Sequence, residues 1–245
     1  MRTSVQSLIE HFYHAAPGWV DGTTQFGALI REHLRPEFRV LDLSAGSGKA
    51  GPVNFQGEVL AAIGIDPDWY ISHNPRIDYA VMGLAERLPL RDASFDVVFC
   101  DWVVEHLARP EVVAAEVLRV LRPEGYFIFR TGNLCHYSYA IAAATPHWFH
   151  RLVANRVRGL RQDKGDPHPT YFRMNTRRAV RRCLDQAGFV EENILMVETE
   201  PSYLMFSAPS FLLGIAYERL VNGAELCSVL RACIFGCFRK PPAIA

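Results

Sequence analysis

The 245-residue sequence lacks several patterns that mark common classes of protein. Its six cysteines form no C-x-x-C pair, which argues against a zinc knuckle and a thioredoxin-like redox site. The formal net charge is +0, so no overall field attracts nucleic acid or a membrane surface. No uninterrupted apolar run follows a basic start, so we expect no secretion signal and a cytoplasmic protein with reduced thiols. The histidines stand at no metal-ligand spacing from a carboxylate or thiolate, so we expect no metal.

Apolar residues are plentiful, at 49% of the chain, which is enough for a sizeable α/β core. The most informative stretch is 39–51. Val40, Leu41 and Leu43 form an apolar run of strand length that ends abruptly in small residues, as a buried parallel strand followed by a tight loop does. Asp42 stands inside this run. A buried carboxylate is costly unless it is paired, so we expect Asp42 to reach a ligand or the amides of the loop.

Three kinds of nucleotide site compete for this loop. A phosphate-binding P-loop needs a glycine at Leu43 and a hydroxyl at Ala50, and both are missing. A dinucleotide fingerprint is formally matched by Gly46, Gly48 and Gly51, with Asp66 at the expected distance. The third is a site for S-adenosylmethionine (SAM), a sulfonium nucleoside without phosphate. Asp42 favours SAM, because a carboxylate would repel a pyrophosphate.

The stretch Val40–Gly48 resembles the first motif of class I SAM-dependent methyltransferases, V-L-D-x-G-x-G-x-G. The resemblance covers residues 38–131. It continues through further motifs at 64–66, 85–90, 94–99, 105–107 and 118–125. Within the family, the sequence resembles the branch that includes ubiquinone/menaquinone-type methyltransferases. It implies an α/β fold: a Rossmann-like, doubly wound, seven-stranded sheet, mainly parallel with an antiparallel last strand.

The sequence therefore predicts a single methyltransferase domain over residues 1–245 with additions to a sheet core. We place the core at 23–131 and 175–240, a substrate or cover insertion at 132–174, and an apolar helical insert at 201–231. Strands are expected at 40–43, 59–65, 77–82, 95–100, 126–131, 193–199 and 232–239, and a short irregular crossover, rather than a long helix, after Gly51-Pro52.

The resemblance also implies a set of cofactor residues. Asp66 would accept hydrogen bonds from the ribose, the backbone around Ala85 would meet the adenine, and Asp101 and Trp102 would touch the methionine part. Ser44 replaces the usual first glycine, so we expect its backbone to stay in the β or αR region. The full predicted set is Asp42, Ser44, Gly46, Gly48, Asp66, Pro67, Ala85, Glu86, Asp101 and Trp102.

Three residues are candidates for catalysis. His106 is suited to act as a general base because its pKa lies near working pH, although it would equally suit local packing or capping. His168 and Tyr171 belong to an aromatic and basic segment, 134–175, which we expect to return to the mouth of the cofactor site and contact the acceptor. Its arginines fit an anionic acceptor group or, alternatively, a solvated helix face.

Residues 202–217 carry no charge and are heavily apolar. This stretch is shorter than the roughly 20 residues that span a bilayer and contains Pro209. It predicts either a helix packed in the core or in a homodimer, or a peripheral contact with a membrane or a lipid-linked substrate.

The reaction expected is methyl transfer from SAM to an oxygen of a small-molecule or lipid- or sugar-linked acceptor, with no DNA partner. Three alternatives remain: a carbon methyltransferase acting on a quinone-like or lipid acceptor, an RNA methyltransferase, and a SAM-binding protein without catalysis.

Overall fold

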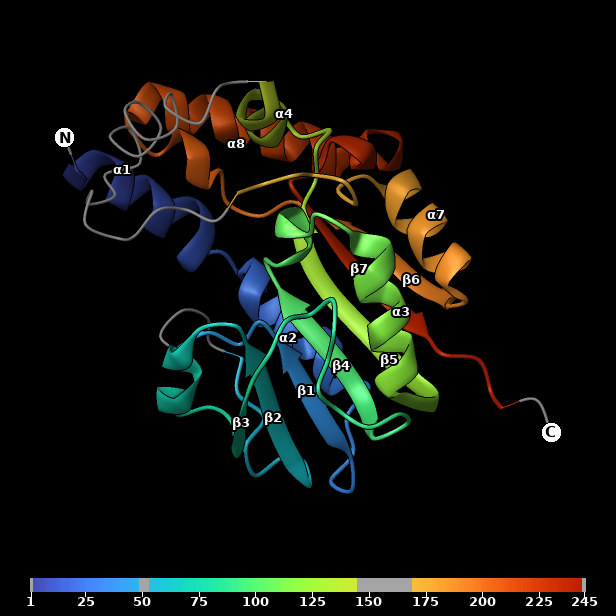
Figure 1. The fold of residues 1–245 in the computed structure, drawn as a ribbon. Coiled ribbons are helices and arrows are strands. Elements are labelled where there is room, and N and C mark those ends of the chain that lie inside the picture. The colour runs from blue at the N-terminus through green and yellow to red at the C-terminus, as the bar shows by residue number, and fades with distance from the viewer. Residues whose placement is uncertain (1, 49–52, 145–168, 244–245) are drawn as a thin grey trace. The chain divides into compact units, whose positions relative to one another are not determined.

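The computed structural model describes residues 2–48, 53–144 and 169–243 (Figure 1). The chain divides into two compact units. The sheet unit comprises Thr23–Gly132, Thr170–Leu195 and Ile234–Ala245, and the helical unit comprises Met1–Gly22, Asn133–Pro169 and Met196–Cys233. The single domain with two insertions stays a prediction.

The sheet has seven strands in the order β3-β2-β1-β4-β5-β7-β6. The first five strands in this order, β3, β2, β1, β4 and β5, pair with one another in parallel. Strand β7 runs antiparallel to β5, because Lys240 exchanges backbone hydrogen bonds with Glu124 and Gly125 at one end while Asn133 pairs with Ala232 at the other. The predicted fold class is confirmed. The strands are β1 (Arg39–Leu43), β2 (Ala61–Asp66), β3 (Tyr79–Met82), β4 (Phe95–Asp101), β5 (Leu121–Gly132), β6 (Val190–Val197) and β7 (Cys233–Arg239).

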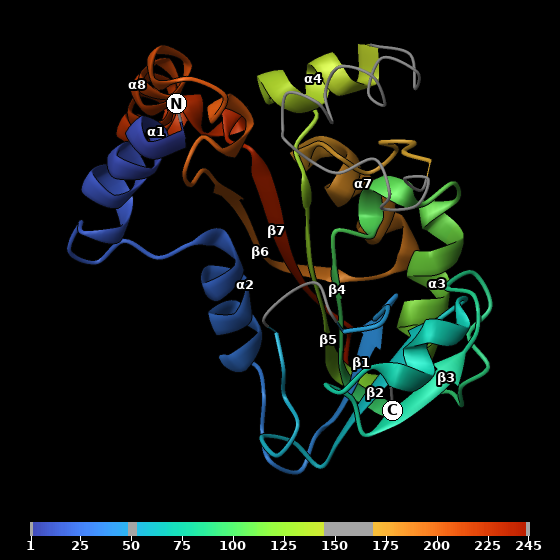
Figure 2. The ribbon, with the colours of Figure 1, turned by 90° about the vertical axis from the view of Figure 1, so that its left-hand side faces the viewer.

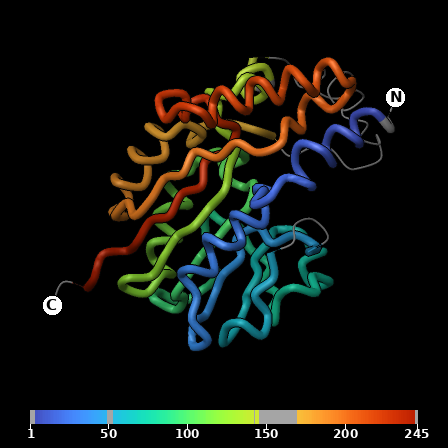
Figure 3. The backbone as a smooth tube through the Cα atoms, turned by 180° about the vertical axis from the view of Figure 1, so that it is seen from behind, coloured from blue at the N-terminus to red at the C-terminus, as the bar shows by residue number. Residues whose placement is uncertain are grey.

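Three helices cover the sheet. Helix α2 (Gly22–Arg31) lies on one face, and α3 (Pro110–Val120) and α7 (Arg177–Ala187) lie on the other (Figure 2; Figure 3 shows the α2 face from behind). Thr176 begins α7, where its hydroxyl accepts from the Ala179 amide at 3.2 Å, and Gly188 ends it with a left-handed φ of 99°.

The core lies where β1, β4 and β5 meet the helices. Leu41, Val97 and Ile128 are fully buried, and so is Cys100, which the sequence predicts as a core residue rather than a nucleophile. Complete burial of such aliphatic side chains stabilises a fold by about 1.5–3 kcal/mol each.

The connection from β1 to β2 forms no helix over residues 53–60, which confirms the predicted irregular crossover. Phe55 packs there instead: its ring lies 5.4 Å from that of Phe99 on β4, and the Arg31 guanidinium lies 5.2 Å from its centre. A single aromatic ring covers less of a sheet than a helix does, so this face of β1 and β4 has room for a cavity.

The helical unit is held together by α1 (Arg2–Ile9), a following turn of π-helix (Glu10–His14) and α8 (Ala208–Gly223), which lie side by side in Figures 1 and 3. Val5, Tyr13, Phe211 and Ile215 form its buried core. It also contains α4 (Tyr137–Ala144) and two short 3₁₀ turns, Ser202–Leu204 and Glu225–Leu230. No helix in the described part of the chain is both long and apolar enough to cross a membrane.

Candidate functional site

The loop after β1 is built from left-handed backbone. Ser44, Gly46 and Gly48 have φ values of 63°, 55° and 69°. The prediction that Ser44 stays in the β or αR region is wrong: the turn out of β1 requires a positive φ at this position. For a residue with a Cβ atom this conformation costs about 1–2 kcal/mol. The loop therefore holds local strain beside the cavity described below.

Two side chains hold the loop in place. The Gly46 amide donates to Asp66 Oδ2 at 2.9 Å, and the Asp68 amide donates to Asp66 Oδ1 at 2.9 Å. The buried Asn74 side chain donates from Nδ2 to the carbonyls of Ala45 and Gly46, at 3.1 and 3.3 Å. Asn74 also requires glycine at position 48, because a Cβ atom there would collide with its amide.

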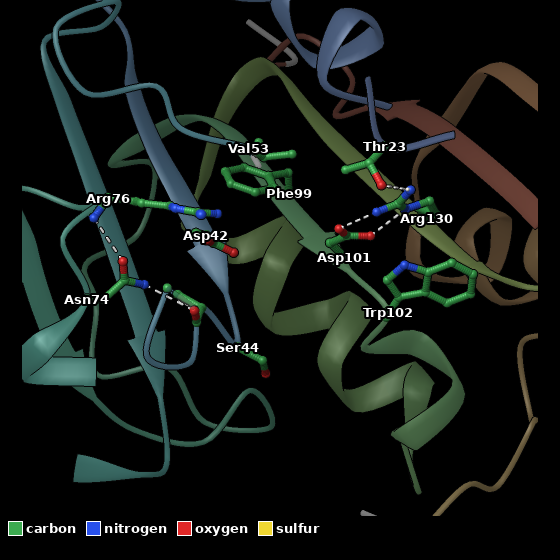
Figure 4. A pocket seen from close by; sticks show the side chains of 12 residues that line it. Thr23, Asp42, Ser44, Val53, Asn74, Arg76, Phe99, Asp101, Trp102 and Arg130 are labelled. Atoms are coloured by element: carbon green, nitrogen blue, oxygen red, sulfur yellow. Dashed lines mark hydrogen bonds and ion pairs between the residues drawn. The ribbon is translucent and has the colours of Figure 1, made fainter. Parts of the chain in front are cut away.

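A cavity of about 370 Å³ opens above the loop, on the face of β1 and β4 that the irregular crossover leaves uncovered (Figure 4). Its size is within the range of small-molecule sites. All its lining residues belong to the sheet unit. They are Thr23, Asp42, Ser44, Ala45, Gly48, Val53, Asn74, Arg76, Phe99, Asp101, Trp102 and Arg130.

The Asp42 side chain points into this cavity from the middle of β1 (Figure 4). Among the residues that the structure describes, none donates a hydrogen bond to its carboxylate. Burial, aided by the charges of Asp101 and Asp66, raises the pKa of Asp42 to about 8, while Arg76 lowers it. Such a carboxyl group favours a cationic ligand that supplies the missing partner.

Arg130 and Asp101 form an ion pair across β5 and β4. The Arg130 Nε and Nη2 atoms each donate to one oxygen of Asp101 at 2.6 Å, and Nη1 donates to Thr23 Oγ1 at 3.0 Å. The rings of Phe26 and Trp102 lie 5.2 and 5.1 Å from the guanidinium carbon. Contacts with these four residues fix the Arg130 side chain, so it forms a rigid wall of the cavity.

The predicted cofactor residues fall into three groups. Asp42, Ser44, Gly48, Asp101 and Trp102 line the cavity, and Gly46 lies in the loop beneath it. Both carboxylate oxygens of Asp66 accept hydrogen bonds from backbone amides, and the exposed Pro67 follows it. Ala85 and Glu86 lie in a turn after β3 that the Arg87 amide closes onto the Leu84 carbonyl, and they do not line the cavity. The roles of these residues stay predictions.

Two candidates for catalysis lie on adjacent segments. His106 ends a 3₁₀ turn (Val104–His106) that follows β4, and the Tyr171 and Phe172 amides donate to the Glu105 carbonyl in the same turn at 2.8 and 3.2 Å. Neither His106 nor the exposed Tyr171 lines the cavity. His168 lies outside the described residues.

A buried hydrogen-bonded chain supports this turn from below. Asn175 Nδ2 donates to Thr131 Oγ1 at 2.8 Å, and Thr131 Oγ1 donates to Glu105 Oε2 at 2.7 Å. Burial raises the pKa of Glu105. The chain joins the end of β5, the turn after β4 and the segment before α7, so the positions of His106 and Tyr171 depend on one network.

Comparison with known proteins identifies the family. Residues 41–129 match the family model described as "Methyltransferase domain". These residues form a class I SAM-dependent methyltransferase domain. The chain is 36% identical, over 43% of its length and 45% of the relative's, to the Mycobacterium ulcerans protein named "Probable phthiotriol/phenolphthiotriol dimycocerosates methyltransferase 2". It is 25% identical to the ubiquinone biosynthesis O-methyltransferase of Xanthomonas oryzae, over 69% of this chain and 75% of that protein.

Solved structures agree on the fold. A SAM-dependent methyltransferase from Methanosarcina mazei superposes with a TM-score of 0.58 at 15% identity, covering 88% of this chain and 98% of that protein. The chain spans less than half the length of the first curated relatives that it matches, from 39% to 45%.

Several residues that line the cavity are not predicted from the sequence. Arg130 is the most informative of them. It places a charge in the predicted strand 126–131, directly after four apolar residues, and the family motifs do not use this signal. Asn74 and Arg76 precede β3 in a connection without regular pattern, so only the folded chain brings them to the loop after β1. The unpredicted lining residues are Thr23, Ala45, Val53, Asn74, Arg76, Phe99 and Arg130.

Proposed function

We propose that this chain transfers a methyl group from SAM to an oxygen of a small-molecule or lipid-linked acceptor. The observation that carries the proposal is the Asp42 carboxyl group, which faces the cavity with no hydrogen-bond donor among the described residues. SAM supplies an electrophilic methyl group on a sulfonium ion, and its methionine end carries an ammonium. Both charges suit a cavity whose acid lacks a partner.

The residues around the cavity act by binding and orientation. The glycine loop allows close approach of backbone to the nucleoside, and the rigid Arg130–Asp101 wall limits how the ligand lies. Placement of the acceptor in line with the methyl group is the main requirement of the reaction, and orientation alone lowers such barriers substantially. The proposed reaction needs no metal.

An oxygen acceptor must lose its proton to a base as the carbon–oxygen bond forms. His106 is the described residue best suited to receive it, because it lies in the turn that the Glu105–Thr131–Asn175 chain supports. Tyr171 and His168 are proposed to contact the acceptor. Replacement of His106 by Gln should lower kcat and remove the fall in rate toward acid pH that protonation of a general base causes, whereas a packing role would leave the shape of the pH–rate profile unchanged.

The choice of oxygen rests on relatives. The Xanthomonas oryzae relative is named for O-methylation in ubiquinone biosynthesis, and the Mycobacterium ulcerans relative is named for methylation of phthiotriol and phenolphthiotriol dimycocerosates. Incubation of the purified protein with methyl-labelled SAM and a cell extract, followed by product identification, tests the proposal. A labelled product with a new methyl ether or ester supports it. A new carbon–methyl bond would favour the carbon methyltransferase, and no labelled product would indicate SAM binding without catalysis.

We also propose a peripheral contact with a lipid surface through α8. Leu212 and Leu213 on this helix are exposed, and Leu220 follows them on the same helix. Flotation with vesicles of neutral and anionic phospholipid tests the contact. We expect the wild type to float, and the double substitution Leu212→Ser, Leu213→Ser to abolish flotation. A concentration-dependent dimer that the same substitutions dissociate would instead assign this helix to a homodimer.

A further inference from the structure

Two side chains of opposite charge face each other in the cavity without forming an ion pair. Figure 4 shows the Arg76 side chain lying across the cavity with its guanidinium directed toward Asp42. Among the described residues, no acceptor binds the guanidinium of Arg76 and no donor binds the carboxylate of Asp42. Each group has lost part of its hydration without gaining a partner, which is unfavourable for both.

The other arginine of the cavity is already occupied. Arg130 is fixed by two hydrogen bonds to Asp101, one to Thr23 and contacts with two aromatic rings. Release of Arg130 toward a ligand would leave Asp101 as a partly buried charge without its partner. Among the lining residues that the structure describes, Arg76 is therefore the cationic group available to an anion.

The backbone of Arg76 is connected to the glycine loop through one residue. The Arg76 amide donates to Asn74 Oδ1 at 2.9 Å, while Asn74 Nδ2 donates to the carbonyls of Ala45 and Gly46. Asn74 thus fixes the start of the Arg76 side chain relative to the loop. The irregular crossover at 53–60 makes this arrangement accessible, because Val53, rather than a helix, borders the cavity beside Arg76.

A ligand that satisfies both groups must carry both signs of charge within a few bonds. An amino-acid end does so, because its ammonium and carboxylate are attached to one carbon atom. A neutral nucleoside would satisfy neither group, and a phosphate would satisfy Arg76 while repelling Asp42. The planar fork of a guanidinium also matches the two oxygens of a carboxylate.

We propose that Arg76 binds the carboxylate of the cofactor's methionine end while Asp42 binds the neighbouring ammonium, with Asn74 as the residue that positions Arg76. This inference rests on the proposed function, since it assumes that SAM occupies the cavity. The connection between β2 and β3, which lies outside the family motifs of this sequence, thereby takes part in cofactor recognition.

Calorimetry with three ligands isolates the carboxylate. S-Adenosylhomocysteine has the complete amino-acid end, decarboxylated SAM lacks only the carboxylate, and 5′-methylthioadenosine lacks the amino-acid end entirely. The substitution Arg76→Met should weaken S-adenosylhomocysteine roughly 10- to 100-fold, the range for loss of a hydrogen bond to a charged group. It should leave 5′-methylthioadenosine within about twofold and leave decarboxylated SAM unchanged or tighter, because a cation beside the ammonium is gone. Arg76→Lys should retain part of the affinity.

The control is Arg178→Met, which removes an exposed arginine from α7 and should change none of the three affinities. Thermal melting of each variant checks the fold. Equal binding of S-adenosylhomocysteine by wild type and Arg76→Met would overturn the inference and leave the proposed function standing. A uniform loss of all three ligands would also overturn it, because that result assigns Arg76 to the shape of the cavity. If the wild type itself fails to bind S-adenosylhomocysteine, the proposed function fails together with the inference.

Discussion

Asp101 and Arg130 stand opposite each other in the register of β4 and β5, and two hydrogen bonds of 2.6 Å join their side chains. Only 5% of the Arg130 side chain and 19% of the Asp101 side chain are exposed. Bidentate pairs of this kind are both strong and directional. The pair closes one side of the cavity and fixes the turn into Trp102, whose φ of 58° is unfavourable for a large side chain.

Breaking this pair should destabilise the protein. We expect Arg130→Met to lower the free energy of unfolding by about 3–5 kcal/mol, because it leaves a largely buried carboxylate without its partner. The double substitution Arg130→Met, Asp101→Asn should recover much of that loss. Urea denaturation measures both.

The Arg181–Glu191 pair is a matched control, with distances of 2.6 and 2.7 Å but side chains that are 45% and 26% exposed. Its loss in Arg181→Met should cost only about 0–1 kcal/mol. Equal losses at the two sites would contradict a special contribution of the Asp101–Arg130 pair.

The two glycines of the loop should respond differently to alanine. Gly48→Ala places a Cβ atom against the Asn74 amide, whereas a Cβ atom at Gly46 meets nothing within 4 Å. Both substitutions incur the cost of a positive φ, about 1–2 kcal/mol. Gly48→Ala should lower Tm further and weaken ligand binding. Combining it with Asn74→Ala should remove the collision but not restore affinity. Identical melting curves for the two single variants would contradict this arrangement.

The strain at Ser44 predicts effects of opposite sign. Ser44→Gly should raise the free energy of unfolding by about 0.5–1 kcal/mol, because glycine adopts the left-handed conformation without a steric cost. The larger entropy that glycine loses on folding offsets only part of this gain. Ser44→Val should lower it by more than 1 kcal/mol, on the order expected for a branched side chain at positive φ. Ser47, in the same loop but without a positive φ, is the control: Ser47→Gly should not stabilise. Denaturant titration that finds Ser44→Gly less stable than wild type would argue against the φ value.

Asp42 predicts a dependence of stability on pH. Its pKa is raised from 3.8 to about 8 in the folded protein, so the folded state binds a proton that the unfolded state has released. The stability that comes from this proton is present below pH 4 and is lost as the pH rises to about 8. Asp42→Asn should therefore raise Tm in the absence of ligand, most strongly at pH 8. An equal Tm difference at pH 4 and pH 8 would contradict the raised pKa.

Ligand affinity should change in the opposite direction with pH. A cation binds the ionised form of Asp42, so wild-type affinity for SAM should rise by up to about tenfold per pH unit between pH 6 and 8. The amino group of SAM titrates nearby, but it does so equally for wild type and Asp42→Asn. The difference between the two proteins, measured by calorimetry, thus reports Asp42 alone.

The sequence predicts the parts of this fold that regular patterns encode. The apolar runs locate all seven strands, and the start of α7 at Thr176 and its end at Gly188 follow from capping chemistry. The backbone of Ser44 is the clear error. Residue propensity excludes a left-handed serine there, but the path from β1 to the loop imposes it.

The composition of the cavity is only partly predictable, for a physical reason. Asp42, Asp101 and Trp102 lie at strand positions that the motifs define. Arg76, by contrast, reaches the cavity from a connection without periodicity. Arg130 reaches it through pairing with Asp101, which lies 29 positions earlier in the chain. Such contacts exist only once the sheet has formed, so no local pattern in the sequence indicates them.

The most direct test of the account is calorimetric titration of the wild-type protein and Asp42→Asn with S-adenosylhomocysteine at pH 8. We predict that the wild type binds one molecule per chain and that Asp42→Asn binds at least tenfold more weakly, about 1.4 kcal/mol or more. Absence of binding to the wild type, or equal affinity of the two proteins, would contradict the claim that the Asp42 carboxylate is the group that receives the cofactor's positive charge.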